Sequence, residues 1–193
     1  MIAQIKGKLI DKTPTYVVID CNGVGYELKI SLNTFSQIGD SENCMLYTHF
    51  VVREDAQLLY GFKQTGEREL FRLLISVSGV GSATAMMILS SLSPNETKQA
   101  ILSGDASTLK SVKGIGAKSA ERIIIDLRDK IGKVDDTTTI SSPTNNTIKE
   151  EALSALVMLG FGKNPAEKTL NKILLSGEEL TVEELIKRTL KNL

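Results

Sequence analysis

The sequence contains few of the residues from which metal and catalytic centres are usually built. It has no tryptophan, one histidine and two cysteines among 193 residues. Neither Cys21 nor Cys44 has a cysteine or histidine near it in the sequence, which excludes a zinc-finger pattern and favours a reducing compartment. His49 lies in an apolar run, so we expect it to be a buried structural residue rather than a catalytic one.

The sequence also lacks net charge and long apolar segments. Basic and acidic side chains both number 23, an unusual balance for a nucleic-acid-binding protein, but they are unevenly distributed. Residues 1–63 carry 6 basic and 7 acidic side chains, residues 64–134 carry 10 and 7, and residues 135–193 carry 7 and 9. The middle of the chain is therefore basic, as a nucleic-acid-binding segment would be. No signal peptide or membrane-length apolar run is present, so we expect a cytoplasmic protein without membrane association.

A short pattern occurs twice within the basic segment. Residues 77–85 and residues 112–120 each contain a glycine, an apolar residue and a second glycine before a run of small residues, and matched positions are 35 apart. A period of this length indicates a duplicated supersecondary unit, which we interpret as a helix, a tight turn and a second helix. Glycine permits positive φ and close approach of a ligand, and the free amides at a helix start attract anions.

Both units resemble the helix-hairpin-helix, a module that binds a nucleic-acid backbone without reading the bases. The candidate DNA-binding residues are Gly79, Val80, Gly81, Ser82, Gly114, Ile115, Gly116, Lys118 and Arg122. We expect the apolar residue of each turn to anchor it in the core, and Ala85 and Ala120 to let the paired helices pack closely. Two ordinary glycine turns in a helical domain are the alternative. A nucleotide-binding loop would need glycine directly before the Lys-Ser pair, where the chain has Ala117, so we find no ATPase motif.

The order of apolar patterns predicts an α+β multidomain chain. Residues 1–63 contain five short alternating or β-branched runs and an Asn-Gly turn signal, which predict a small OB-type β-barrel. Residues 64–131 predict about five helices, residues 132–149 predict a flexible linker without apolar periodicity, and residues 150–193 predict a three-helix module.

Several local signals mark the expected helix starts. Ser93 with Glu96 and Thr181 with Glu184 form capping-box patterns, and Asp105 and Thr65 are further candidate caps. In the last module, Leu156 lies on the expected inward face. Leu159 and Phe161 either complete the core or meet a protein partner.

Two adjacent carboxylates, Glu54 and Asp55, lie between the last two predicted strands. A hairpin tip at this point would project them from the barrel. On the residue pattern alone, a solvated turn is the better interpretation.

The order of parts resembles the RuvA family, the Holliday junction branch migration subunits. The most specific match is residues 48–62, which closely resemble the family segment that bears an acidic pin. The start of the chain, residues 23–27, both hairpins and residues 155–161 also fit, so the resemblance covers the chain apart from the linker.

The resemblance implies a non-enzymatic DNA-binding subunit with no catalytic residue, metal or cofactor, acting in recombination, DNA repair and the SOS response. In the family, the carboxylates matched by Glu54 and Asp55 lie near the centre of a four-fold tetramer and repel phosphates at the crossover. The resemblance also implies a homotetramer or octamer, and a larger complex that includes the RuvC resolvase. It further implies that residues 150–193 bind RuvB, a hexameric ATPase, and Leu156, Leu159 and Phe161 are the candidate contacts.

Two further readings remain open from the residues. A generic helix-hairpin-helix adaptor would bind duplex DNA without preference for branched DNA. A nuclease or glycosylase would need converging carboxylates or a catalytic aspartate, for which Asp126 is the nearest candidate. The chain also departs from the family at the first hairpin, where Ser82 and Ala83 replace a common Pro-Lys pair, so the lysine contact there is missing.

Overall fold

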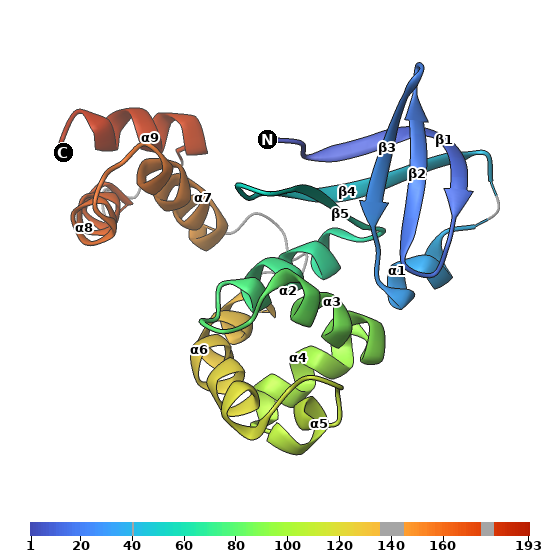
Figure 1. The fold of residues 1–193 in the computed structure, drawn as a ribbon. Helices are drawn as coiled ribbons and strands as arrows, with labels where there is room; N and C mark the ends of the chain where they lie inside the picture. Colours follow the sequence, from blue (N-terminus) through green and yellow to red (C-terminus); the bar gives the residue numbers. More distant parts are fainter. Residues whose placement is uncertain (40, 136–144, 175–179) are drawn as a thin grey trace. The chain divides into compact units, whose positions relative to one another are not determined.

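The computed structural model describes residues 1–39, 41–135, 145–174 and 180–193. The chain forms two compact units, Met1–Thr137 and Thr138–Leu193. Figure 1 shows that the first unit contains the β-barrel and the helices from α1 to α6, and that the second contains α7 to α9. The predicted division between residues 63 and 64 falls inside the first unit, between β5 and α2.

Five strands close into a barrel in the order β1-β2-β3-β5-β4, which confirms the predicted fold of this part. The strands are β1 (Gln4–Lys12), β2 (Tyr16–Cys21), β3 (Val24–Lys29), β4 (Asn43–Val52) and β5 (Gln57–Phe62). Each neighbouring pair is antiparallel except β3 and β5, which are parallel where Lys29 pairs with Tyr60. Asn22 and Gly23 join β2 to β3 with φ of 55° and 91°, the positive pair that a type I′ turn needs.

A short helix, α1 (Leu32–Gln37), follows β3 and was not among the elements predicted for residues 1–63. Ser31 and Thr34 at its start donate hydrogen bonds of 2.5 and 2.7 Å to the Glu67 carboxylate on α2 (Thr65–Ile75), which is 1% exposed. A buried carboxylate is costly unless donors surround it. These two bonds therefore fasten the first helix of the hairpin region to the barrel.

Five helices follow the barrel, as predicted: α2, α3 (Ser82–Ser91), α4 (Pro94–Ser103), α5 (Ala106–Lys110) and α6 (Ala117–Asp135). Ser93 forms a capping box with Glu96, and the Asp105 carboxylate accepts two backbone N–H bonds, which confirms both predicted caps. The predicted Thr65 cap is wrong. Thr65 is already the first helical residue, and the preceding Gln64 makes no side-chain capping bond.

The helices pack on the barrel around Phe71 of α2. Its ring lies 5.0 Å from Tyr60, 5.1 Å from Phe62 and 5.4 Å from His49, so it contacts both β4 and β5. His49 is half-buried, and burial with nearby Arg72 and Arg68 lowers its pKa below the ordinary 6.5. This environment fits the predicted structural role.

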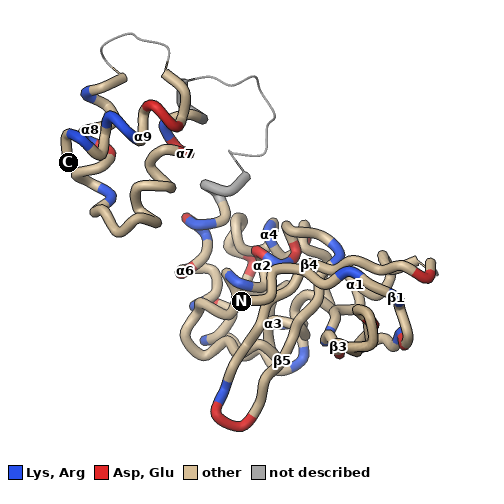
Figure 2. The backbone as a smooth tube through the Cα atoms, turned by 90° about the horizontal axis from the view of Figure 1, so that it is seen from above, with Lys and Arg blue, Asp and Glu red and all other residues tan. Residues whose placement is uncertain are grey.

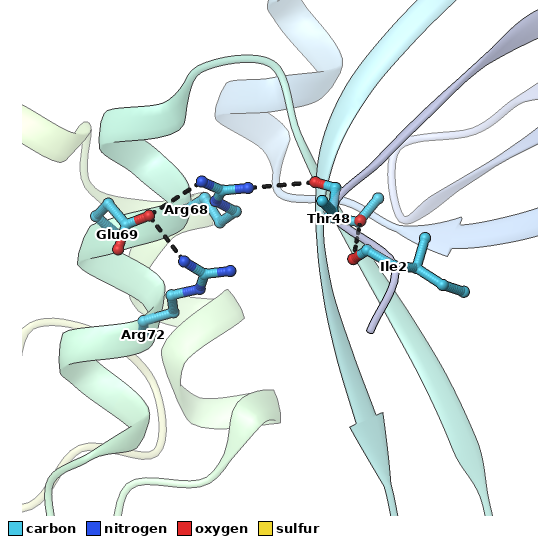
Figure 3. Close-up of polar contacts among 6 residues, drawn as sticks. Ile2, Thr48, Arg68, Glu69 and Arg72 are labelled. Atoms are coloured by element: carbon cyan, nitrogen blue, oxygen red, sulfur yellow. Dashed lines mark hydrogen bonds and ion pairs between the residues drawn. The ribbon is translucent and has the colours of Figure 1, made fainter. Parts of the chain in front are cut away.

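Polar contacts continue the same interface. Figure 3 shows Arg68, Glu69 and Arg72 on α2 facing Thr48 on β4 and Ile2 near the chain start. Arg68 donates to the Ala3 carbonyl at 3.2 Å, and Thr48 donates to the Ile2 carbonyl at 2.7 Å. The barrel and the hairpin helices are thus joined by apolar and polar contacts.

The predicted linker, residues 132–149, is helical at both ends in the structure. Helix α6 continues to Asp135, and α7 (Asn145–Met158) begins before the predicted helix start. Ile148, which is inside the predicted linker, packs against the second core, so a tertiary contact supports a helix where composition alone predicted none. The rest of the predicted linker, residues 136–144, lies outside the described residues.

The second unit contains α7, α8 (Lys163–Leu174) and α9 (Val182–Leu190), which confirms the predicted three-helix module. Its small core consists of Ala152, Leu156, Ala166, Leu170, Leu180 and Leu185. Thr181 and Glu184 form the predicted capping box at the start of α9. Within the described parts of the chain, none of the helices combines the length and the apolar character that crossing a bilayer requires.

Candidate nucleic-acid interface

The two glycine turns have the same backbone structure. The Val80 N–H donates to the Val77 carbonyl at 3.0 Å, and 35 residues later the Ile115 N–H donates to the Val112 carbonyl at 3.1 Å. The glycine inside each turn has positive φ, 86° at Gly79 and 91° at the matching position, Gly114. Only glycine adopts this conformation without strain, so the turn explains the first glycine of each repeat.

The second glycine of each repeat has a different purpose. Gly81 precedes α3 with a negative φ of −84°, and a Cβ atom at either Gly81 or Gly116 would meet no atom within 4 Å. Neither the backbone nor the packing therefore requires glycine here. Both positions are exposed, so the missing side chain leaves room for an approaching ligand.

The helices that follow these glycines begin without a capping side chain and without an acidic residue in the first turn. Gly81 offers no side-chain cap to α3, and neither α3 nor α6 has an acidic residue in its first turn. By contrast, α4 and α9 have both a capping side chain and first-turn glutamates. Uncompensated amides at a helix start attract anions, and a phosphate is the matching ligand.

Two of the predicted DNA-binding residues, Val80 and Ile115, do not offer a free amide, and a third, Ser82, does not offer an exposed side chain. Val80 and Ile115 are 5% and 6% exposed, and their N–H groups are already bonded inside the turns. They anchor the turns in the core, as the sequence also suggested, and do not offer amides to a ligand. Ser82 is 5% exposed, so its side chain is buried at the start of α3 and a hydroxyl contact with a phosphate is not supported.

The two hairpins differ sharply in charge. Lys113, Lys118 and Arg122 are exposed around the second turn and the start of α6. The positions 35 residues earlier carry Ser78, Ala83 and Met87, none of which is charged. Comparison of the repeats thus identifies Lys113 as a further basic residue, which the motif-based reading had missed. A cation in the first turn of a helix, such as Lys118, opposes the helix dipole, and a bound anion would offset this unfavourable interaction.

Arg122 reaches across to the other hairpin. Its Nη1 atom donates to the Ser78 carbonyl at 3.1 Å and lies 3.7 Å from the place that a Cβ atom on Gly79 would occupy. The structure therefore brings a side chain of α6 to the first glycine turn.

The β4–β5 hairpin ends in the predicted acidic tip. Glu54 and Asp55 are exposed between the strands, and the Arg53 N–H donates to the Ala56 carbonyl at 2.8 Å, closing the turn. Figure 2 shows the tip as an acidic loop projecting from the first unit, with a basic residue beside it. Val51 and Leu58 pack against the helical core, so the stem of this hairpin is held in place.

The predicted partner-binding residues separate into two groups. Leu156 is fully buried in the core of the second unit, so its assignment as a contact is wrong, because its side chain already packs inside the module. Leu159 and Phe161 are 61% and 38% exposed and follow α7. With Met158, which is 86% exposed, they form an apolar surface, here called the α7 end.

The described residues offer little support for enzymatic chemistry. Among them, no group of three or more His, Cys, Asp or Glu side chains is close enough to hold a metal ion. Asp126 lies on the surface of α6 beside Lys118 and Arg122. Cys21 and Cys44 are free thiols, and burial raises the pKa of the Cys44 thiol.

A five-stranded barrel followed by a tandem pair of helix-hairpin-helix units defines a class of proteins that bind nucleic-acid backbones. Family models agree with each part. Residues 1–61 match the RuvA N terminal domain, residues 71–129 match the SAM-like helix-hairpin-helix tandem, and residues 147–193 match the RuvA C-terminal domain.

Full-length relatives lead to the same family. The chain is 57% identical to the Holliday junction branch migration complex subunit RuvA of Christiangramia forsetii, with 100% of both chains covered. It is 50% identical to the RuvA subunit of Flavobacterium psychrophilum and 47% identical to that of Bacteroides thetaiotaomicron, again over 100% of both chains. The chain belongs to the RuvA family of Holliday junction branch migration complex subunits.

Proposed function

We propose that this chain is a non-catalytic subunit that binds four-way DNA junctions as a homotetramer and holds them open for branch migration in recombination and repair. The observation that carries the proposal is the pair of glycine turns, each leading into an uncapped helix start with open space at its second glycine. The names of its full-length relatives, which are branch migration complex subunits, support the same activity.

The two hairpins suit a ligand with regularly spaced phosphates. Each contributes backbone amides that bind an anion without contacting base edges, so binding depends on the DNA backbone rather than on its sequence. Four subunits related by cyclic symmetry would place one pair of hairpins on each arm of the junction. An octamer would cover the junction from both faces.

The acidic tip acts by repulsion. Glu54 and Asp55 carry negative charge on a hairpin whose stem is packed against the helices, so they exclude phosphates from their surroundings. Near the centre of a tetramer, this exclusion would keep the crossing strands apart and guide their separation.

Replacing both carboxylates tests this role. The double variant E54Q/D55Q should bind a four-way junction as tightly as the unmodified chain or more tightly, because phosphate repulsion is removed, while branch migration with the motor changes. Gel shift measures the first property and strand exchange measures the second. Severe loss of junction binding would contradict an exclusion role.

The second unit provides the binding surface for the motor protein. We propose that the α7 end binds the RuvB hexameric ATPase, because Met158, Leu159 and Phe161 are large exposed apolar residues on a small module whose core is already complete. The RuvC resolvase would join the larger complex.

Substitutions at the α7 end separate motor binding from DNA binding. L159S/F161S should abolish capture of RuvB in a pull-down and leave junction binding unchanged. Leu190 on α9 is 40% exposed in the same unit, so L190S is the matched control and should retain capture. Equal capture by all three proteins would exclude this surface.

The decisive test of the whole proposal compares a four-way junction with a linear duplex of equal length, in the absence of ATP and metal ions. Preference for the junction, with four or eight chains bound, is the expected result. Equal binding to both would reduce the chain to a generic helix-hairpin-helix adaptor. In a separate assay, cleavage that D126N abolishes would instead favour a nuclease if it requires added metal ions, or a glycosylase if it does not.

A further inference from the structure

We infer that Arg122, although it belongs to the second hairpin, supplies the positive charge for the phosphate bound at the first hairpin. The inference rests on the proposed function, because it assumes that both glycine turns bind the DNA backbone. It adds that a side chain of the second hairpin provides the charge that the first hairpin needs to bind its phosphate.

The turn and the second helix of the first hairpin have no cation, and Arg68 and Arg72 on its first helix, α2, are engaged with Glu69. Residues 76–91, which contain its turn and all of α3, include neither lysine nor arginine. The positions that match Lys118 and Arg122 are Ala83 and Met87, and both line an apolar pocket beside the barrel. A phosphate at the first turn would therefore meet backbone amides without a neutralising side chain from that repeat.

Arg122 lies where the missing charge is needed. Its guanidinium donates to the Ser78 carbonyl, one residue before Gly79, and its Nη1 atom is 3.7 Å from the Cβ position of that glycine. Guanidinium has five N–H donors in a planar fork, and the bond to Ser78 uses one of them. The side chain is exposed, so the remaining donors can bind a phosphate bidentately.

The position of Lys118 differs. It lies in the first turn of α6, beside the amides of the second hairpin, and the structure shows no contact between it and the first turn among the described residues. Glu121 and Asp126 flank the two cations on the same helix surface and reduce the net charge there. Lys118 therefore serves the second phosphate, and Arg122 serves the first.

An alternative explanation is that Arg122 only braces the first turn through Ser78. The two explanations differ in what a lysine at position 83 does. If Arg122 provides charge, A83K in the R122Q background restores a cation at the first hairpin without restoring the bond to Ser78. If Arg122 is only a brace, A83K adds the same affinity and salt dependence to the unmodified chain as to R122Q, whereas if Arg122 already supplies the charge, A83K adds less to the unmodified chain; the single variant A83K is therefore the control.

The test uses the full chain, a four-way junction and mapping of essential phosphates by ethylation interference. G81A and G116A first identify the phosphate bound by each hairpin, since each adds a methyl group where the structure has open space. R122Q should lose the phosphate that G81A loses, and the dependence of log affinity on log salt should become shallower by about 0.9. A83K/R122Q should regain both, and all variants should melt within a few degrees of the unmodified chain.

Three outcomes overturn the inference. The first is that R122Q loses the same phosphate contact as G116A, which would show that Arg122 acts at the second hairpin. Alternatively, A83K fails to rescue while exchange of the Val80 amide quickens in R122Q, which would show that Arg122 acts as a brace. If neither G81A nor G116A weakens junction binding, the proposed function itself fails, and that result is distinct from the other two.

Discussion

The two hairpins share one backbone but carry different charges. Their turns have matching hydrogen bonds, their first glycines have the same left-handed conformation, and the helices that follow begin with matching bonds to Gly81 and Gly116. Their side chains differ, because the second has Lys113, Lys118 and Arg122 where the first has uncharged residues. The comparison teaches that the turn geometry is a requirement of folding, whereas charge can be supplied by either repeat.

This difference has a physical basis. Both turns have a glycine at positive φ and an apolar anchor in the core, so folding constrains the same positions in both copies. The attraction between a phosphate and a cation depends on the distance between them, whichever repeat carries the cation. The tandem can thus bind two phosphates with an unequal distribution of basic residues.

The largest expected effect comes from filling the open space at the second glycines. G116A and G81A should each weaken junction binding by about tenfold to a hundredfold, since a methyl group displaces a charge-assisted hydrogen bond of roughly 1.5–3 kcal/mol. Fluorescence anisotropy at a fixed salt concentration measures the change. G66A at the start of α2 is the matched control, because a Cβ atom there also meets nothing within 4 Å.

If G116A and G81A bind the junction as tightly as G66A does, the turns do not approach the DNA backbone, and their matching geometry has no role in DNA binding. A large effect of only one variant would show that a single hairpin contacts DNA.

Neutralising the charges of the second turn should give the next largest effect. K113Q/K118Q should make the salt dependence of junction binding shallower by about 1.8, because two phosphate contacts lose their counterion release. The matched substitutions in the first hairpin, S78Q and A83Q, remove no charge and should leave the salt dependence unchanged. Equal slopes for all variants would mean that these lysines do not contact phosphates.

A stability measurement should show the two turns to be equivalent. G79A and G114A should each lower the free energy of unfolding by about 1–2 kcal/mol, since alanine is strained at the positive φ that both positions require. Urea unfolding monitored by circular dichroism measures this. A much larger loss at one position would contradict the matching turn geometry.

The smallest expected effect concerns the helices that precede the turns. Asp105 caps α5 before the second hairpin, and hydrogen bonds from Ser107 and Thr108 lower its pKa from 3.8 to about 2, whereas α2 before the first hairpin has no side-chain cap. Because the folded pKa is the lower one, this stabilisation is full above pH 3.8 and is lost as the pH falls towards about 2. Amide exchange in α5 should therefore quicken across this interval.

The control for this pH dependence is D105N, which keeps a capping side chain but removes the titrating group. Its α5 amides should lose the pH dependence, and those of α2 should be unaffected in both proteins. The same acid response in D105N would exclude Asp105 as its cause.

Local sequence signals were sufficient where the interaction spans a few residues. The Asn22–Gly23 turn and the caps at Ser93, Asp105 and Thr181 follow from residue type and spacing, because each partner lies within about four positions along the chain. The strands follow from the alternation of apolar and polar residues, which is also a local pattern. The same holds for the glycine turns. Each has its complete hydrogen-bonding pattern within one short segment.

Local signals failed where burial depends on distant partners. Ser31 caps helix α1 locally through the Thr34 N–H, but the burial of its start depends on Glu67, which lies more than thirty residues later in the chain. Ser82 was named as a DNA contact and Leu156 as a partner contact, but both side chains are buried. Packing against the second core likewise supports the helix at Ile148, where composition alone predicted a linker.

The residue order therefore specifies a barrel, two backbone-binding turns and a helical module, because hydrogen bonds between near neighbours and the apolar period set these elements. Contacts between segments far apart in the chain settle which side chains remain available to a ligand. They bring Arg122 to Ser78 of the other repeat. No spacing rule encodes that contact, because it depends on how two whole helices pack against each other.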